Sequence, residues 1–314
     1  MLGAPAVPES RDLDTEDAWQ VLRRVRYWPL LRRSMWRFRQ ADGYSYARAV
    51  GFQIVLAFLP ALVFFVAVGV SLGSGTVQTA IESVVTSLAP GSTSDFFQQA
   101  VEQGEQNARG NTLAIVLGGI TALTSGAVGM SQVQQGAGRI YGRDEDRAFV
   151  KRYSLSLALS LSAGLLLAGA FVAISFGSNI ADAVQGESVW AWLRWPLGSA
   201  GLVAGIAVLY KVAPNRNQPG VSWLIVGGLT ATVLLLVFSS GLALYLALSS
   251  TFGDTYGPLA GLIGFMIWAQ MTGLAILLGL AFAAQLEAER AKHPDGSAGA
   301  SSAESASLPT PVNG

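Results

Sequence analysis

The sequence lacks cysteine altogether and contains a single histidine, His293, close to its C-terminal end. The absence of thiols excludes disulfides, thiolate metal sites and cysteine nucleophiles. Zinc also lacks the histidine and cysteine ligands that it usually takes in proteins. No glycine-rich nucleotide fingerprint follows a strand, and a serine without a neighbouring base is not a nucleophile. We therefore expect no enzyme activity, no metal and no cofactor.

Charged residues are also scarce. They make up 13% of the 314 residues, against about 25% in soluble domains, while 51% are hydrophobic and the mean hydropathy is +0.44. The formal net charge is zero, so no global field recruits nucleic acid. This composition indicates an integral membrane protein. The stretch before Ala49 lacks the apolar core of a cleaved signal peptide, so we expect the first membrane helix to direct insertion.

Six windows without a charged residue divide the rest of the chain: 49–81, 110–138, 153–181, 195–210, 217–253 and 255–286. A helix rises about 1.5 Å per residue, so roughly 20 residues cross the hydrocarbon core of a bilayer. We predict an all-α integral membrane protein with six transmembrane helices, at about 49–72, 113–135, 154–177, 195–210, 221–248 and 257–286. The fourth window has only 16 residues and could instead form a re-entrant segment.

The distribution of Lys and Arg decides between the two topologies. With six spans and a cytoplasmic N-terminus, only Arg109 and Arg194 of the 20 basic residues lie outside, which leaves 18 inside. If the fourth segment does not cross, the split falls to 14 against 6. Because cytoplasmic loops carry an excess of Lys and Arg, we expect six spans with both termini in the cytoplasm.

The regions around the spans differ in composition. Residues 1–48 are predicted to form a cytoplasmic tail with a basic amphipathic helix in the membrane interface. Residues 49–290 are the predicted membrane domain, which includes a small helical extracytoplasmic segment at 73–112. The Ser-, Ala-, Gly- and Pro-rich residues 291–314 are expected to be a disordered cytoplasmic tail.

Basic and aromatic residues alternate at helical spacing between Trp19 and Phe38, and Pro29 is expected to divide this stretch into two helices. The pattern is typical of a helix that lies among lipid headgroups. It also occurs in nucleic-acid-binding proteins, but its place beside a membrane helix favours lipid. We therefore expect the partner to be the bilayer, with anionic lipids at its cytoplasmic face, and not nucleic acid. The candidate lipid contacts are Arg23, Arg24, Trp28, Arg32, Arg33 and Trp36.

Polar residues and a proline inside the apolar windows are candidates for a substrate pathway. They are Gln53, Pro60, Gln132, Gln135, Arg139 and Gln270. The three residues at 132, 135 and 139 share one helix face, which could line a cavity or could simply mark where the helix leaves the membrane. The amides at 53 and 270 could contact substrate or bond to a neighbouring helix, and the proline could be a hinge or a static kink.

Several segments, taken in order, resemble one family of bacterial membrane proteins. The step Ala57-Phe58-Leu59-Pro60 fits a small-residue helix of that family, and LYKVAPNR at 209–216 is the strongest element. YGPLAG at 256–261 and QLEAE at 285–289 also fit. Together, across roughly residues 20–290, they resemble the YihY/virulence factor BrkB family. The motif residues are Tyr210, Pro214, Arg216, Tyr256, Gly257 and Trp268.

The resemblance implies a six-helix, multi-pass protein of the bacterial inner (plasma) membrane with cytoplasmic termini, in agreement with the charge count. It implies little about activity. The family once carried a ribonuclease label, but the sequence has no carboxylate or histidine cluster with metal-ligand spacing. The chain also departs from the family at Ala137 and Gly138, where a leucine and an asparagine are usual, so no role of that asparagine is carried over.

Two hypotheses of function follow. The first is a permease or flippase-like transporter for an amphiphilic or anionic solute, with lipids and their precursors among the solutes considered. The alternative is a non-transporting scaffold that organises lipids or partner proteins, and a membrane nuclease is a third, less favoured hypothesis. No charged residue lies deep in a predicted span, which argues against a proton pump built on buried carboxylates. The substrate, direction and oligomeric state stay open at this stage.

Overall fold

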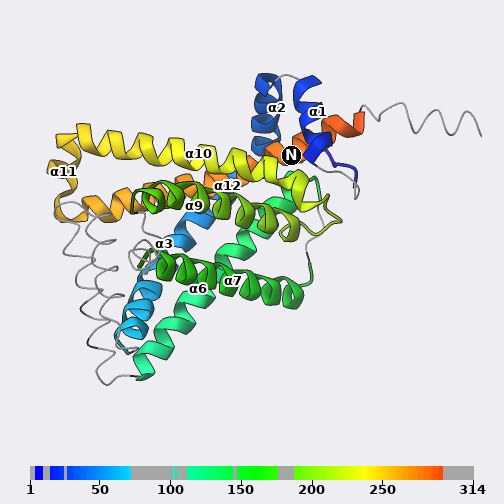
Figure 1. The fold of residues 1–314 in the computed structure, drawn as a ribbon. Coiled ribbons are helices and arrows are strands. Elements are labelled where there is room, and N and C mark those ends of the chain that lie inside the picture. Colours follow the sequence, from blue (N-terminus) through cyan, green and yellow to red (C-terminus); the bar gives the residue numbers. More distant parts are fainter. Residues whose placement is uncertain are drawn as a thin grey trace, which may run out of the picture.

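Every regular element in the described part of the chain is a helix, as the sequence predicts. The computed structural model describes residues 4–9, 15–24, 27–71, 102, 106, 112–143, 147–175 and 187–292. Its helices (Figure 1) are α1 Thr15–Arg24, α2 Tyr27–Gln40, α3 Gly43–Ser71, α6 Thr112–Ile140, α7 Phe149–Ser175, α9 Glu187–Val212, α10 Val221–Leu248, α11 Ser250–Tyr256, the 3-10 turn η2 Gly257–Leu259 and α12 Ala260–Lys292. The predictions for 73–112 and 291–314 fall almost entirely outside the described residues.

Among the described residues, four helices are long and apolar enough to cross a membrane: Gly43–Ala67 of α3, Ile115–Ile140 of α6, α10 and α12. They coincide with the first, second, fifth and sixth predicted spans. α7 and α9 lie over the third and fourth. α9 has 26 residues, from Glu187 to Val212, so the short window 195–210 covers only part of a longer helix. Helices suit the hydrocarbon core of a bilayer because each one satisfies its backbone hydrogen bonds internally.

α3 and α6 form one closely packed pair. Gly119 and Gly129 of α6 face α3, where a Cβ on the first would lie 2.9 Å from the ring of Phe64 and a Cβ on the second 3.2 Å from the Cβ of Gln53. Small residues at such positions let two membrane helices approach along their backbones.

α3 also contacts α12 through its first half. A Cβ on Gly273 of α12 would lie 2.5 Å from the carbonyl oxygen of Ala47, so only glycine fits this contact. Farther along, the ring centroid of Phe58 is 4.6 Å from that of Phe265. Beyond this point α3 packs on α6, through Phe64.

α9, α10 and α12 form a second group. A Cβ on Gly227 of α10 would lie 2.8 Å from the Cβ of Ala283 of α12. Tyr210, near the end of α9, donates a hydrogen bond of 2.5 Å to the carbonyl oxygen of Ile276 in α12. A Cβ on Gly279 would lie 2.6 Å from the same hydroxyl. These contacts hold the three helices together near one end of the molecule.

The two helix groups meet at one end and separate toward the other (Figure 1). α10 and α12 run side by side, while α3 and α6 slant away from them. The groups meet where α1 and α2 lie, and we call this the α2 end.

α2 lies across the direction of α10 and α12 at the α2 end (Figure 1). The ring of its first residue, Tyr27, is 5.3 Å from that of Phe282 of α12. The N-terminal stretch forms two helices, as expected, since α1 ends at Arg24 and α2 begins at Tyr27. The division comes before Pro29, which lies in the first turn of α2, where its missing N–H removes no helical hydrogen bond.

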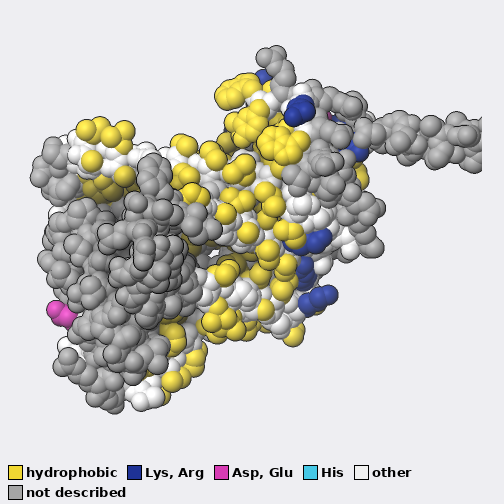
Figure 2. All heavy atoms as spheres, viewed as in Figure 1, with side chains coloured by type: hydrophobic (Ala, Val, Ile, Leu, Met, Phe, Trp, Pro, Cys, Tyr) yellow, Lys and Arg dark blue, Asp and Glu magenta, His cyan; other side chains and the backbone are white. Residues whose placement is uncertain are grey.

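Apolar side chains cover much of the outside of the bundle, and Lys and Arg gather toward the α2 end (Figure 2). Leu166 of α7, Val237 of α10 and Leu248 at the end of α10 are each more than half exposed. A broad apolar surface of this kind suits lipid contact and not water.

Candidate functional site

A fully buried ion pair joins the turn between α9 and α10 to the end of α12. Arg216 Nη2 lies 2.5 Å from Glu287 Oε1, and both side chains are 0% exposed. The guanidinium also lies over the ring of Tyr141, with its Cζ 4.4 Å from the ring centroid. Removing one partner of a buried pair costs about 3–5 kcal/mol, because the other charge stays unpaired. The pair therefore fixes the turn firmly on α12.

A second buried arginine, Arg37 of α2, extends this network. Its Nε donates to Gln285 Oε1 at 3.1 Å, and its Nη1 donates to the carbonyl oxygen of Ile140 at 3.0 Å. Gln285 donates to Glu289 Oε1 at 2.8 Å, and Arg33 forms an ion pair with the same oxygen at 2.8 Å. We refer to the following residues as the ion cluster: Arg37, Tyr141, Arg216, Gln285, Glu287 and Glu289.

Residues 4–9, which we call the N-terminal strap, cover the ion cluster. Arg37 and Arg216 donate hydrogen bonds of 2.8, 3.3 and 3.1 Å to main-chain oxygens of the strap. The acceptors are the carbonyl oxygens of Pro5, Val7 and Pro8. Glu9, at the end of the strap, forms an ion pair with Arg143. Carbonyl oxygens thus satisfy guanidinium N–H groups that Glu287 and Gln285 do not reach.

Arg147 holds the end of α9. It donates to the carbonyl oxygens of Val212, Ala213 and Pro214 at 2.9, 2.9 and 2.8 Å. The last carbonyls of a helix lack partners in the helix and form the negative end of its dipole. A guanidinium there donates the missing hydrogen bonds and also places a positive charge at that negative end. Arg147 also donates to Gln134 Oε1 of α6 at 2.8 Å, which ties α9 to α6.

Burial shifts the pKa values of three side chains at the α2 end, those of Arg37, Arg147 and Tyr141. Burial lowers the pKa of Arg37, and the neighbouring Tyr141 and Glu287 partly offset that effect. Burial likewise lowers the pKa of Arg147. Because a guanidinium has a very high intrinsic pKa, both stay charged. Burial raises the pKa of Tyr141 well above the ordinary tyrosine value, so its hydroxyl stays neutral.

The polar face predicted on α6 makes no hydrogen bond to another helix through Gln135, the predicted residue whose bonds are described. Gln135 donates at 3.4 Å to groups one turn back in its own helix, Gln132 is half-buried, and Arg139 is exposed. The α6 amide that links elements is Gln134, which sequence reasoning did not single out. Besides accepting from the guanidinium described above, it donates to Ser156 Oγ of α7 at 2.8 Å.

The other pathway candidates lie along α3 and α12. Gln53 is half-buried between α3 and α6, and Gln270 is exposed, with its backbone against Gly51 of α3. Pro60 lies within α3, which stays helical on both sides of it, two residues after Phe58, whose ring contacts Phe265 of α12. A part for these three residues in a substrate pathway stays a prediction.

The motif residues fall at the two ends of the bundle. Tyr210, Pro214 and Arg216 lie at the α2 end, where each contributes a hydrogen-bonding group to the contacts above. At the far end, Gly257 has a φ of +47°, a conformation that favours glycine, directly after Tyr256. Trp268 Nε1 of α12 donates to Ser239 Oγ of α10 at 3.0 Å.

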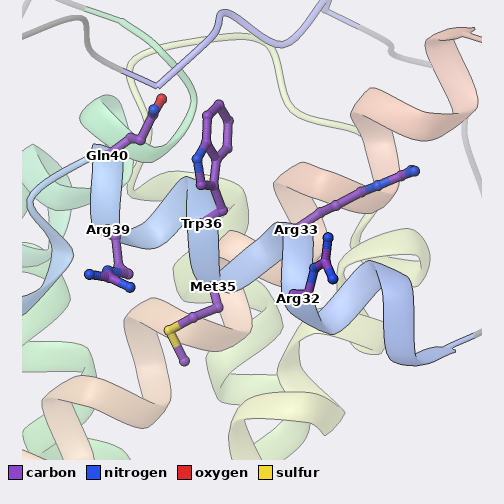
Figure 3. Close-up of a pocket in the computed structure, with 6 residues that line it drawn as sticks. All are labelled: Arg32, Arg33, Met35, Trp36, Arg39 and Gln40. Carbon is purple, nitrogen blue, oxygen red and sulfur yellow. The ribbon is translucent and has the colours of Figure 1, made fainter.

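Three of the candidate lipid contacts, Arg32, Arg33 and Trp36, line an open hollow of about 800 Å³ on α2. Trp28 is 75% and Trp36 53% exposed. Figure 3 shows Trp36 and Gln40 projecting from one edge of α2, and Met35 and Arg39 from the other. The lining residues are Arg32, Arg33, Met35, Trp36, Arg39 and Gln40. Arg23 of α1 is exposed as well, while the Arg24 side chain lies outside the described residues.

Among the residues that the structure describes, no group of three or more His, Asp or Glu side chains could hold a metal ion.

Sequence reasoning missed most of the ion cluster and also missed Arg147. Arg37 was one of several arginines in a basic stretch, Arg147 lay in a charged loop, and Glu287 was noted only within a motif. A usable signal was present for two of them: Arg147 and Glu287 are charges close to an end of an apolar helix, where buried partners of opposite sign or free carbonyls are at hand.

Comparison with known proteins points to one family. The family described as Virulence factor BrkB matches residues 35–304 of this chain. YfkH of Bacillus subtilis (strain 168), described as ribonuclease-like, is 27% identical over 267 residues, which cover 82% of this chain and 95% of that protein. A UPF0761 membrane protein of Rhodospirillum centenum is 30% identical over 266 residues, which cover 83% of this chain and 58% of that protein. The chain thus spans little more than half the length of this second relative. No solved structure matches this chain.

Proposed function

We propose that this protein, which belongs to the virulence factor BrkB family of multi-pass membrane proteins, is a permease or flippase-like transporter for an amphiphilic or anionic solute. The observation that carries the proposal is the ion cluster, which joins α2, the end of α6 and the α9–α10 turn to α12 at one end of the bundle. In Figure 1 the axes of α3 and α6 slant away from those of α10 and α12 with distance from that end. A transporter alternates between states in which one side of the bundle is closed, and a buried polar closure at one end suits such a mechanism.

We infer six spans with both termini in the cytoplasm, with α7 and α9 as the third and fourth spans. In this orientation the α2 end faces the cytoplasm, and the ion cluster closes that side. The bias of Lys and Arg toward the cytoplasmic loops supports the orientation, since 18 of 20 then lie inside. Lipids and their precursors are among the solutes that a basic rim beside an apolar bundle suits.

In this proposal, opening the cytoplasmic side requires the ion cluster to come apart. The cluster connects α2, the end of α6 and the α9–α10 turn to α12. Buried ion pairs add little net stability against an apolar alternative, but they hold a structure in one arrangement. A contact that fixes one arrangement at little net gain in stability suits the closed side of a transporter, because that side must also open. Pro60, two residues beyond the ring contact of Phe58 with Phe265 of α12, acts as the hinge, because proline removes one helical hydrogen bond.

The alternative is a non-transporting scaffold for lipids or partner proteins. It is favoured by the close contact at Gly273, which leaves no space between α3 and α12 in their first halves. A scaffold predicts that this contact never opens. We do not carry the ribonuclease-like description of YfkH over to this chain, and the proposal predicts no cleavage of RNA by the purified protein with Mg²⁺, Mn²⁺ or Zn²⁺.

Flux measurements on proteoliposomes test the proposal. Vesicles that hold the protein are expected to scramble a fluorescent phospholipid or release an entrapped anionic dye faster than empty vesicles. The double variant R216M/E287L, which removes the buried pair, is expected to change that rate. R143Q, which removes a more exposed pair with Glu9, is the control. Rates equal to empty vesicles for both probes, in wild type and in the double variant, would reject transport and favour the scaffold.

A further inference from the structure

α2 has two chemically different faces. Leu30, Ser34, Arg37 and Phe38 are buried against the bundle. The opposite face exposes Arg32, Met35, Trp36 and Arg39, and the helix contains no acidic residue. We call this opposite face, together with Arg33 and Gln40, the outer face of α2.

The outer face lies at the level where the apolar part of α12 gives way to charge. Tyr27, at the start of α2, is in ring contact with Phe282, while Arg33 pairs with Glu289 two turns farther along α12. α2 runs across α12 and not parallel to it (Figure 1). In a bilayer crossed by α12, this places the outer face among the lipid headgroups, with the exposed indole of Trp36 at the depth that tryptophan prefers.

We propose that the outer face of α2 is a binding site for the phosphate headgroup of an anionic phospholipid. The open hollow of about 800 Å³ on this face is bounded by three guanidinium groups, those of Arg32, Arg33 and Arg39. A guanidinium presents paired N–H donors that match phosphate oxygens. Trp36 and Met35 supply apolar surface beside them, as the glycerol and upper acyl chains of a lipid require.

Arg33 connects this site to the ion cluster. Its Nη1 lies 2.8 Å from Glu289 Oε1, the same oxygen that accepts from Gln285. A headgroup phosphate that draws Arg33 outward would weaken its pair with Glu289. Occupancy of the lipid site would then act on the cluster, whether the bundle transports or serves as a scaffold.

Lipid retention in nanodiscs tests the site without reference to transport. The full-length protein is placed in phosphatidylcholine alone or in an equimolar mixture with phosphatidylglycerol, and the lipids retained after mild extraction are counted by native mass spectrometry. The test variant is R32Q/R39Q, which keeps Arg33 with Glu289. The matched control is R48Q/K151Q, which removes two exposed charges elsewhere.

We expect wild type and control to retain phosphatidylglycerol in preference to phosphatidylcholine. The test variant is expected to lose about 30-fold in affinity for phosphatidylglycerol, since each basic residue near an anionic surface contributes about a factor of five. An equal loss in the control, or no loss in the test variant, would overturn the site. Displacement of the lipid by millimolar inorganic phosphate would show a soluble-anion site instead. Displacement by single-stranded RNA would assign the face to nucleic acid and likewise overturn the proposal.

Discussion

Breaking the buried pair is expected to destabilise the protein far more than its replacement by two apolar residues. Arg216 and Glu287 are both 0% exposed, so each single variant, E287Q or R216M, leaves one polar or charged group without its partner. We expect each to lower the free energy of unfolding by about 3–5 kcal/mol. The double variant R216M/E287L leaves no charge behind. It is expected to lose less than the two single losses added, with a coupling energy of at least about 2 kcal/mol.

Unfolding by SDS in mixed micelles, followed by circular dichroism, measures these free energies. R143Q is the control, because its pair with Glu9 is partly exposed and is expected to contribute about 0–1 kcal/mol. Single-variant losses that simply add to that of the double variant, or that match the control, would refute the argument that these two charges depend on each other. Loss of folding in all three variants would not rescue it, since the double variant leaves neither charge of this pair without its partner.

Further predictions concern the surroundings of the cluster. R147A is expected to cost about 1–3 kcal/mol of stability in the same assay, because it leaves the last carbonyls of α9 without donors, and R147K is expected to recover part of this. G279L is expected to destabilise by several kcal/mol, since its Cβ would lie 2.6 Å from neighbouring atoms, whereas G201A, which meets nothing within 4 Å, is expected to be neutral or slightly stabilising. The raised pKa of Tyr141 means that the unfolded chain gives up its proton at lower pH than the folded protein. Stability is therefore expected to fall as pH rises past the ordinary tyrosine value, and Y141F is expected to reduce that slope in alkaline unfolding titrations.

The helices were predictable because their signals are local. A charge-free apolar run of about 20 residues satisfies its own backbone in lipid, so the windows mark the helices wherever they pack. α10 has the bounds of the predicted fifth span, Val221 and Leu248. The two helices around Pro29 were expected, but their boundary was not: a proline in the first turn of a helix breaks nothing, and the sequence alone did not fix where that turn began.

The candidate site was harder to predict because it depends on contacts between distant residues. Arg216 and Glu287 are 71 positions apart, and Arg37 and Gln285 are 248 apart. Composition shows such residues only as charges near helix ends, which is also where solvated charges lie. The sequence analysis named Gln135 as a candidate, whereas Gln134 is the residue that contacts α7. The spacing of residues shows which of them share a helix face, but it does not show which face lies against α7. The motif resemblance located Arg216 without indicating its partner.

The central claim, that the ion cluster closes the cytoplasmic side of a six-span bundle, is tested most directly by cysteine labelling, because the natural chain contains no cysteine. Asn215, in the turn at the α2 end, and Leu259, in η2 at the opposite end of the bundle, are both exposed. We predict that N215C reacts with a membrane-impermeant maleimide in inverted vesicles and not in intact spheroplasts, and that L259C shows the reverse. Labelling of N215C from outside, or of both positions from one side, would contradict the account.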